Sequence, residues 1–304
     1  MDSKNTYSEG YSETNGVKIF YRDYGPADGK PVLLVHGLGA QLVHWPPHLI
    51  AFLQEHNYRP ITYDNRDAGL SSRFFGEPSF VLDYIKYFFR FPIKSEYTID
   101  DMAEDGMNLL NTLAIKKVHI IGTSMGGMIA QIISAQYPDR IKSFTLIAST
   151  ASTPSPMNAP SNEVQTLMMA RSKNPNPTIE EVYKREVAFV TLIGMEGREV
   201  DTPEFRAETL KNFQRAQDGS GYSRQLLAIL ASKNRIDKVK QIKAPTLIIH
   251  GKHDPMIDLK NAHKMHTLIP GSQLEIIANM RHLIEPEILK QFEMRLLEHL
   301  KLND

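Results

Sequence analysis

A serine at position 124 stands in a pattern that can make a hydroxyl group nucleophilic. The stretch Gly122-Thr-Ser-Met-Gly126 follows the apolar run Lys117–Ile121 and precedes a helical pattern that begins at Gly127. A serine on such a sharp strand-to-helix turn projects its Oγ above the sheet, and flanking glycines relieve the crowding of the turn. The free N–H groups of the helix N-terminus lie directly behind it. The pattern therefore predicts that Ser124 is a nucleophile.

A serine hydroxyl needs a general base, and the base needs an acid that orients it. After the serine, Asp254 follows the apolar run 245–251, and His282 follows the strand-like run 273–278. Open α/β sheets keep their chemistry at the carboxyl ends of the strands, so we expect both side chains near Ser124. The order serine, aspartate, histidine is also the order that this type of turn predicts.

Other residues compete for these two roles. Asp258 is an alternative acid, but it lies further from the strand end than Asp254. A lone aspartate before proline is also an ordinary turn former. The chain has further histidines after the serine that do not follow the last strand, and these are the weaker candidates for the base: His253, His263 and His266. The joint placement of the three predicted residues favours the catalytic interpretation.

A turn upstream offers part of an oxyanion hole. The residues 31–35 form a buried-strand pattern that runs into His36-Gly-Leu-Gly39. An oxyanion hole of this kind takes one backbone N–H from the residue after the nucleophile and another from the loop after this strand. We therefore predict that the backbone N–H groups of Leu38 and Met125 are the donors. Losing one such donor typically costs ~3–4 kcal/mol of transition-state stabilisation.

Together these residues resemble the α/β-hydrolase superfamily, and more closely its compact, lidded members. The resemblance runs from about Tyr11 to the last helix and includes Asp64-Asn-Arg-Asp-Ala-Gly-Leu-Ser71, which is similar to the Asp-x-Arg-Gly-x-Gly-x-Ser loop of that superfamily. Asp67 stands where glycine is usual, as in a branch similar to polyketide methyl-ester hydrolases and related carboxylesterases. We expect Arg66 and Asp67 to brace the loop through local pairs. Arg281 replaces the small residue that commonly precedes the histidine, and we expect it to face solvent.

The resemblance implies an enzyme that cleaves carboxylic esters through an acyl-enzyme on Ser124, with His282 as base and Asp254 as acid, and with no metal or cofactor. Epoxide hydrolases and haloalkane dehalogenases of this superfamily are excluded, because they carry aspartate where this chain has serine. Three alternatives stay open on the same scaffold. They are a hydrolase of carbon–carbon bonds in ring-fission diketones, a small-molecule receptor without turnover, and a perhydrolase.

The composition of the chain narrows its partners. A chain of 304 residues can form one domain with an insertion. Its 35 basic and 35 acidic residues cancel, so no long-range field attracts nucleic acid or an anionic membrane. The absence of cysteine excludes disulfides and thiolate metal sites. No apolar segment resembles a signal peptide or reaches the ~20 residues of a membrane span, so we expect a cytoplasmic enzyme with a small-molecule ester substrate.

Strands that alternate with helices predict an α/β fold with a mostly parallel, twisted sheet and helices on both faces. One half-exposed strand and six short apolar strands covered on both faces are expected at 17–22, 31–35, 60–63, 117–121, 144–148, 246–250 and 274–278. The alternation stops after a breaker-rich hinge at 152–160, and only helix signals follow. We predict an α/β-hydrolase core of 1–150 and 234–304 with an inserted helical cap, or lid, of 151–233 over the serine.

The predicted cap carries two helix-start signals, at Thr178 and at Asp201-Thr-Pro-Glu204. Caps exclude water and shape the pocket for the acyl group or the alcohol. Several apolar side chains are candidates for the pocket lining, with packing inside the cap as their other explanation: Met168, Met169, Phe189, Leu192 and Met195.

The segment 79–91 is apolar except for charges at 83, 86 and 90. This spacing predicts a helix with one narrow polar stripe, which must bury most of its surface. We expect it to dock beneath the cap as part of the pocket wall. A homodimer contact or a lipid-facing patch is the alternative.

Overall fold

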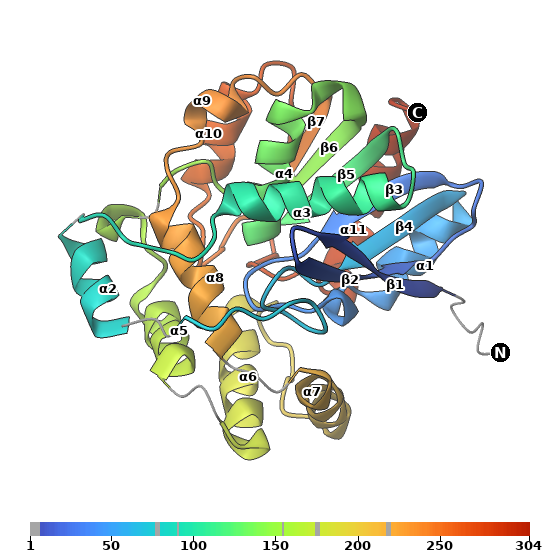
Figure 1. Cartoon of the computed structure of the whole chain (residues 1–304). Coiled ribbons are helices and arrows are strands. Elements are labelled where there is room, and N and C mark those ends of the chain that lie inside the picture. The colour runs from blue at the N-terminus through green and yellow to red at the C-terminus, as the bar shows by residue number, and fades with distance from the viewer. Residues whose placement is uncertain (1–6, 77–79, 90, 154, 174–176, 217–219) are drawn as a thin grey trace.

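The computed structural model describes residues 7–76, 80–89, 91–153, 155–173, 177–216 and 220–304. Over these residues the chain forms one eight-stranded sheet with helices on both faces (Figure 1). The strands are β1 (Ser8–Thr14), β2 (Val17–Asp23), β3 (Lys30–Val35), β4 (Tyr58–Tyr63), β5 (Val118–Thr123), β6 (Ile141–Ile147), β7 (Thr246–Gly251) and β8 (Gln273–Ile277). Their order across the sheet is β1-β2-β4-β3-β5-β6-β7-β8.

The sheet is mostly parallel, as predicted. β2 runs antiparallel to β1 and to β4, and the pairs from β4 to β8 are all parallel. β5 and β7 are buried throughout, as continuous apolar strands covered on both faces should be. β8 departs from that expectation, because it is the edge strand and its Ile276 is 37% exposed. The sequence predicts every strand except β1.

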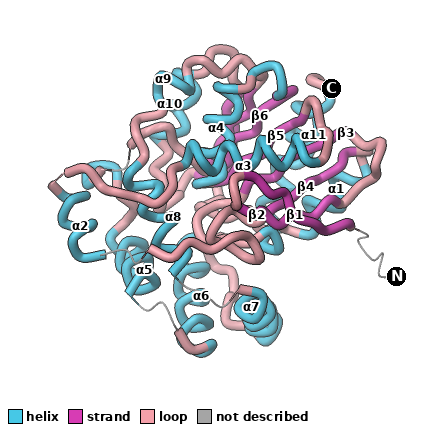
Figure 2. Tube along the Cα trace, in the orientation of Figure 1, coloured by secondary structure: helices cyan, strands magenta, loops and turns pink. Residues whose placement is uncertain are grey.

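Helices lie on both faces of the sheet (Figure 2), and an apolar cluster packs between the helices and the sheet on each face. One cluster contains side chains of α3 (Ile99–Thr112), α4 (Met125–Gln136), α9 (Ile236–Val239) and α10 (Lys260–Leu268). The other contains side chains of α1 (Pro47–Glu55) and α11 (Pro286–Lys301). The central strands are thus held between two helical layers, which gives the loops at their carboxyl ends a rigid base.

Between β6 and β7 the chain leaves the sheet and forms α5 (Asn162–Lys173), α6 (Ile179–Ile193), α7 (Pro203–Arg215) and α8 (Ser220–Ala231). We call these the cap helices, and they fill the lower part of Figure 1. Both predicted helix starts are confirmed, because the Thr178 and Thr202 hydroxyls accept hydrogen bonds from the third backbone N–H of α6 and α7. The two ends of this insertion meet, since Arg235 N–H donates to Ala151 O at 3.3 Å.

The segment 79–91 contains the predicted helix, α2 (Phe80–Phe88), and Tyr87 of this helix lines a cavity of about 160 Å³, as expected of a pocket wall. The expected burial of most of its surface is wrong. Its positions 79 and 90 lie outside the described residues. Four apolar side chains of this segment are between 46% and 64% exposed: Ile85, Phe88, Phe89 and Phe91. The reason is that α2 packs on α8 at the periphery of the molecule (Figure 1), which leaves these four described side chains open to solvent. None of the described helices is both long and apolar enough to cross a bilayer.

Candidate active site

Ser124 lies at the turn between β5 and α4 in a backbone conformation that few residues adopt. Its φ is 54° and its ψ is −121°. Strained conformations of this kind persist only where the surroundings enforce them, and they cluster at functional sites. Here the surroundings are glycines, because a Cβ on Gly122 would lie 2.6 Å from the backbone oxygen of Gly126. A Cβ on Gly126 would in turn overlap the backbone oxygen of Val35. The turn is thus packed too closely for side chains on either glycine.

The loop after β3 lies directly against this serine. A Cβ on Gly37 would be 3.1 Å from Ser124 Cβ. Leu38 follows in that loop, and Met125 is the first residue of α4, where helical N–H groups have no partner within the helix. Among the described residues, neither the Leu38 N–H nor the Met125 N–H has a backbone or side-chain acceptor. Two free backbone donors therefore flank the serine.

Asp254 and His282 meet in a buried pair. His282 Nδ1–H donates to Asp254 Oδ2 at 2.7 Å, and the two residues are 5% and 8% exposed, respectively. The other carboxylate oxygen, Oδ1, accepts from the backbone N–H groups of Met256 at 2.8 Å and Ile257 at 3.0 Å. These bonds fix the carboxylate behind the imidazole. With Nδ1 as the donor, Nε2 of His282 is left free to accept a proton.

Ser124 and His282 line the same cavity, which has a volume of about 500 Å³. Among the described residues, no hydrogen bond links Ser124 Oγ to the imidazole. Catalytic contacts are commonly long in the absence of substrate. The competing acid and histidines are all exposed to solvent: Asp258, His253, His263 and His266. The residues predicted from the two strand ends are therefore the ones that meet near the serine.

The loop that carries His282 is tied to the C-terminal end of α6. His282 N–H donates to Ile193 O at 2.8 Å. Arg281 donates to Leu192 O at 3.1 Å, and its side chain is only 25% exposed. The expectation that Arg281 faces solvent is therefore wrong, because the end of a cap helix offers its unpaired carbonyl groups to the guanidinium.

The loop after β4 is braced locally and is also joined to the cap. Asp67 has a φ of 66°, and its carboxylate accepts from Arg224 of α8 at 2.8 and 2.9 Å and from Tyr97 Oη at 2.7 Å. Arg66 makes a two-fold pair with Asp105 of α3 at 2.7 and 2.8 Å. The expected local bracing is confirmed in part, because Phe74 N–H donates to Asp67 Oδ1 at 2.9 Å. The charged partners of Arg66 and Asp67 lie outside the loop, because the loop is buried at the junction of core and cap. Burial and the Asp67 carboxylate also raise the pKa of Tyr97.

Two further histidines lie in the cavity wall and are uncharged near neutral pH. Burial lowers the pKa of His36 to about 3, and the nearby His44 and His282 act in the same direction. The pKa of His44 is also lowered, by desolvation within the cleft and by the charges of Arg171 and Arg215. Neither ring can therefore contribute a fixed positive charge to a bound substrate.

Three of the five apolar residues expected to line a pocket do line one of two cavities, and two do not. Phe189 lines the 500 Å³ cavity, whereas Met168 and Met169 line a second cavity of about 160 Å³. Leu192 and Met195 line neither of these two cavities. Met195 packs against the apolar cluster of α1 and α11. These two residues lie at the end of α6 and just beyond it, where the chain turns away from the serine.

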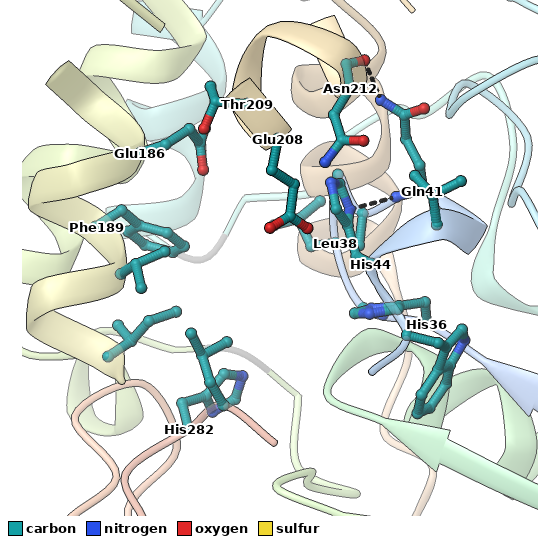
Figure 3. A pocket seen from close by; sticks show the side chains of 18 of the residues that line it. His36, Leu38, Gln41, His44, Glu186, Phe189, Glu208, Thr209, Asn212 and His282 are labelled. Carbon is teal, nitrogen blue, oxygen red and sulfur yellow. Dashed lines mark hydrogen bonds between the residues drawn. The ribbon is translucent and has the colours of Figure 1, made fainter. Parts of the chain in front are cut away.

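Several polar residues line the larger cavity although no sequence pattern predicts that they do. They come from the cap helices and from the loop after β3, and Figure 3 shows them around the cavity: Gln41, His44, Glu186, Glu208, Thr209 and Asn212. Helical spacing indicates which of these residues share a helix face. It does not indicate that the face meets a cavity. Among the described residues, no group of three or more histidine, aspartate or glutamate side chains is placed to hold a metal ion.

Comparison with known proteins agrees with this arrangement. The family described as the alpha/beta hydrolase fold matches residues 30–285. The chain belongs to the α/β-hydrolase fold family. This α/β-hydrolase is similar to the rhodomycin D methylesterase of Streptomyces peucetius, with 26% identity over 272 residues, 84% of this chain and 86% of the relative.

Solved α/β-hydrolase structures share the fold of this chain. The enol-lactonase from Burkholderia xenovorans is 23% identical with a TM-score of 0.73, and the match covers 96% of this chain and 100% of that one. A meta-cleavage product hydrolase from Pseudomonas fluorescens is 21% identical with a TM-score of 0.73, covering 97% of this chain and 98% of that one. At these identities the likeness establishes the fold of this α/β-hydrolase and not its substrate.

Proposed function

We propose that this protein is a serine hydrolase that cleaves carboxylic esters through Ser124, His282 and Asp254. The observation that carries the proposal is the buried Asp254–His282 hydrogen bond at a cavity that also holds Ser124 on a strained turn. Strained backbone, an oriented imidazole and two free N–H groups in one place are the parts that acyl transfer requires. The similarity to a methylesterase supports ester chemistry.

The reaction follows in two steps from these positions. His282 Nε2 takes the Ser124 hydroxyl proton while Oγ attacks the ester carbonyl carbon, and Asp254 stabilises the imidazolium. The Leu38 and Met125 N–H groups bind the oxyanion. Collapse of this intermediate breaks the bond to the alcohol, which leaves with the proton from His282. His282 then takes a proton from water, hydroxide adds to the acyl-enzyme, and the acid is released as Ser124 regains its proton.

We assign the insertion 151–233 the role of a cap over this site. Its helices supply Phe189 to the larger cavity and Met168 and Met169 to the smaller one. The cap thereby excludes water from the serine and shapes the space for both halves of an ester.

Substitution of the three residues tests this assignment. We expect Ser124→Ala to lower kcat for a p-nitrophenyl ester by roughly 10⁶-fold, as in a well-studied serine triad. Asp254→Asn should lower kcat strongly, whereas Asp258→Asn, at an exposed position, is the matched control. A fluorophosphonate probe should label Ser124, located by mass mapping of the adduct. Near-normal turnover of Ser124→Ala, or a larger loss in Asp258→Asn than in Asp254→Asn, would contradict the proposal.

Carbon–carbon hydrolysis of ring-fission diketones is the second candidate. It requires polar groups beyond the triad to promote ketonisation of the substrate, and the larger cavity offers such groups in Arg185 and Asn212. A panel that compares simple aryl esters with vinylogous diketones separates the two functions. A kcat/KM higher for the diketones would replace the ester proposal with this one.

A further inference from the structure

Two cavities meet at Ser124. Within the described part of the chain, the larger cavity, of about 500 Å³, and the smaller, of about 160 Å³, share Leu38, Ser124 and Met256 and no other lining residue. They differ in the catalytic group that each contains. His282 lines the larger cavity, and Met125 lines the smaller one. The serine is therefore placed at the junction of two chambers of different size, which we call the large chamber and the small chamber.

The course of acyl transfer assigns the two halves of an ester to these chambers. The leaving alcohol must receive its proton from His282, so its oxygen lies on the imidazole side of the serine. The carbonyl oxygen lies between the N–H groups of Leu38 and Met125. The acyl chain then extends away from the imidazole, on the Met125 side. The geometry points to a substrate whose alcohol fills the large chamber and whose acyl group fills the small one.

The small chamber limits the acyl group by size and polarity. Its walls are mainly apolar, with Met128 from α4, Met168 and Met169 from α5, and Ile229 and Leu230 from α8. Its volume is close to that of a cavity of ~150 Å³ that holds benzene in another protein. An apolar acyl group of up to about six carbons therefore fits. A fatty acyl chain of twelve carbons exceeds this volume and would have to extend out of the chamber into solvent, because the chamber is partly open.

The large chamber favours an alcohol that is bulky and carries hydroxyl groups. His282 lies at one end in Figure 3, and Gln41, Glu186, Glu208 and Asn212 gather at the other. Among the described residues, Glu208 has no hydrogen-bond or ion-pair partner, and its carboxylate points into the cavity. The Glu208 carboxylate and the Asn212 side-chain amide can accept from and donate to hydroxyl groups. The Gln41 amide is already bonded to Asn212 O and to Arg215.

The charge balance of the large chamber disfavours an ionic alcohol. Of the residues that the structure describes, three arginines and three glutamates line it: Arg171, Arg185, Arg198, Glu186, Glu208 and Glu285. Two of the glutamates already have arginine partners, at 3.5 Å from Arg171 to Glu186 and 2.6 Å from Arg198 to Glu285. A neutral, polyhydroxylated alcohol such as a sugar matches this chamber. A methyl ester would leave it almost empty.

This inference rests on the proposed function, and a matrix of four esters tests it separately. The esters are methyl butanoate, methyl dodecanoate, glucose 6-O-butanoate and glucose 6-O-dodecanoate, assayed by release of acid with the wild-type protein. We expect the highest kcat/KM for glucose butanoate, at least tenfold above either dodecanoate and above methyl butanoate. Highest kcat/KM for methyl dodecanoate, or equal values for all four, would overturn it. If no ester is cleaved and the phosphonate probe leaves Ser124 unlabelled, the proposed function itself fails.

Two variants test the assignment of each chamber. Leu230→Phe should lower kcat/KM for butanoate relative to acetate esters about tenfold, because the larger ring fills the small chamber. Glu208→Gln should lower the preference for glucose over methyl esters about tenfold. The matched controls are Leu210→Phe and Glu204→Gln, both on exposed positions of α7 outside the two linings. If Leu230→Phe changes the alcohol preference and Glu208→Gln the acyl preference, the chambers are assigned the wrong way round.

Discussion

Replacing one partner of the ion pair between Asp67 and Arg224 should lower the free energy of unfolding more than replacing both partners together. The Asp67 side chain is fully buried and that of Arg224 is 5% exposed. Arg224→Met leaves a buried carboxylate without its counter-charge, so we expect a loss of about 3–5 kcal/mol in the free energy of unfolding. Asp67→Gly leaves the guanidinium buried and should cost a similar amount.

The double variant Asp67→Gly/Arg224→Met should be closer to wild type than either single variant. It loses the two hydrogen bonds that the Asp67 carboxylate accepts from Tyr97 Oη and from Phe74 N–H, which contribute roughly 1 kcal/mol each. It also relieves the positive φ of Asp67, which costs a non-glycine residue roughly 1 kcal/mol. The net loss of the double variant is then roughly 1 kcal/mol, below that of either single variant, so most of the single-variant loss should reappear as a coupling energy between the two positions.

Urea unfolding measured at equilibrium gives the four free energies of this cycle, provided that the m-value stays constant. The single variants should also melt ~6–10 °C lower than wild type, at roughly 2 °C per kcal/mol for a chain of this size. Arg206→Met is the control, because it removes an exposed cap pair with Glu180 and should change stability little. A double variant whose loss equals the sum of the two single losses would refute the reasoning.

Three further expectations follow from other contacts. Gly126→Ala places a methyl group against Val35 O, so kcat/KM for an aryl ester should fall at least ~100-fold; near-normal activity would show that the turn adapts. Glu285 is 4% exposed and accepts from Met195 N–H beside the proposed base, so we infer that it positions the loop around His282. Glu285→Gln should therefore lower kcat by about tenfold with little change in KM. An effect on KM alone would exclude this positioning role. Burial lowers the pKa of His299 to about 4, so between pH 6.5 and 4 the unfolded chain binds a proton that the folded protein does not. The free energy of unfolding should therefore fall on acidification, by up to roughly 3 kcal/mol from this group, and His299→Leu should flatten the dependence measured by urea unfolding.

The nucleophile turn can be predicted from the sequence because all of its parts are contiguous. The strand, the glycines and the helix that hold Ser124 occupy one short stretch of chain. Asp254 and His282 can be predicted because each follows a strand, and parallel strands bring their carboxyl ends to one edge of the sheet. Their hydrogen bond agrees with that expectation. The order and direction of the strands therefore predict that these two residues are close in space, although they are far apart in the sequence from Ser124.

Contacts between core and cap could not be predicted in this way. Arg224, the partner of Asp67, is 157 positions away in the sequence. The charge of Asp67 shows that this residue needs a partner when it is buried, but it does not indicate which residue that is. The exposure of α2 was missed for a related reason, since periodicity describes a helix face but not whether another element covers it. β1 was missed because Ser8–Thr14 is mostly polar, and its backbone pairing with β2 leaves little hydrophobic alternation.

The contact between Arg235 and Ala151 has a consequence for how proteins of this architecture diversify. Because the inserted segment starts and ends at adjoining points, a shorter or longer replacement closes the same gap, and each doubling of its length costs only ~0.6 kcal/mol in chain entropy. The scaffold can therefore accept a different segment by recombination without new strand pairing. Selectivity can then change in a single genetic event, while the residues proposed to transfer protons, which lie outside that segment, are inherited intact.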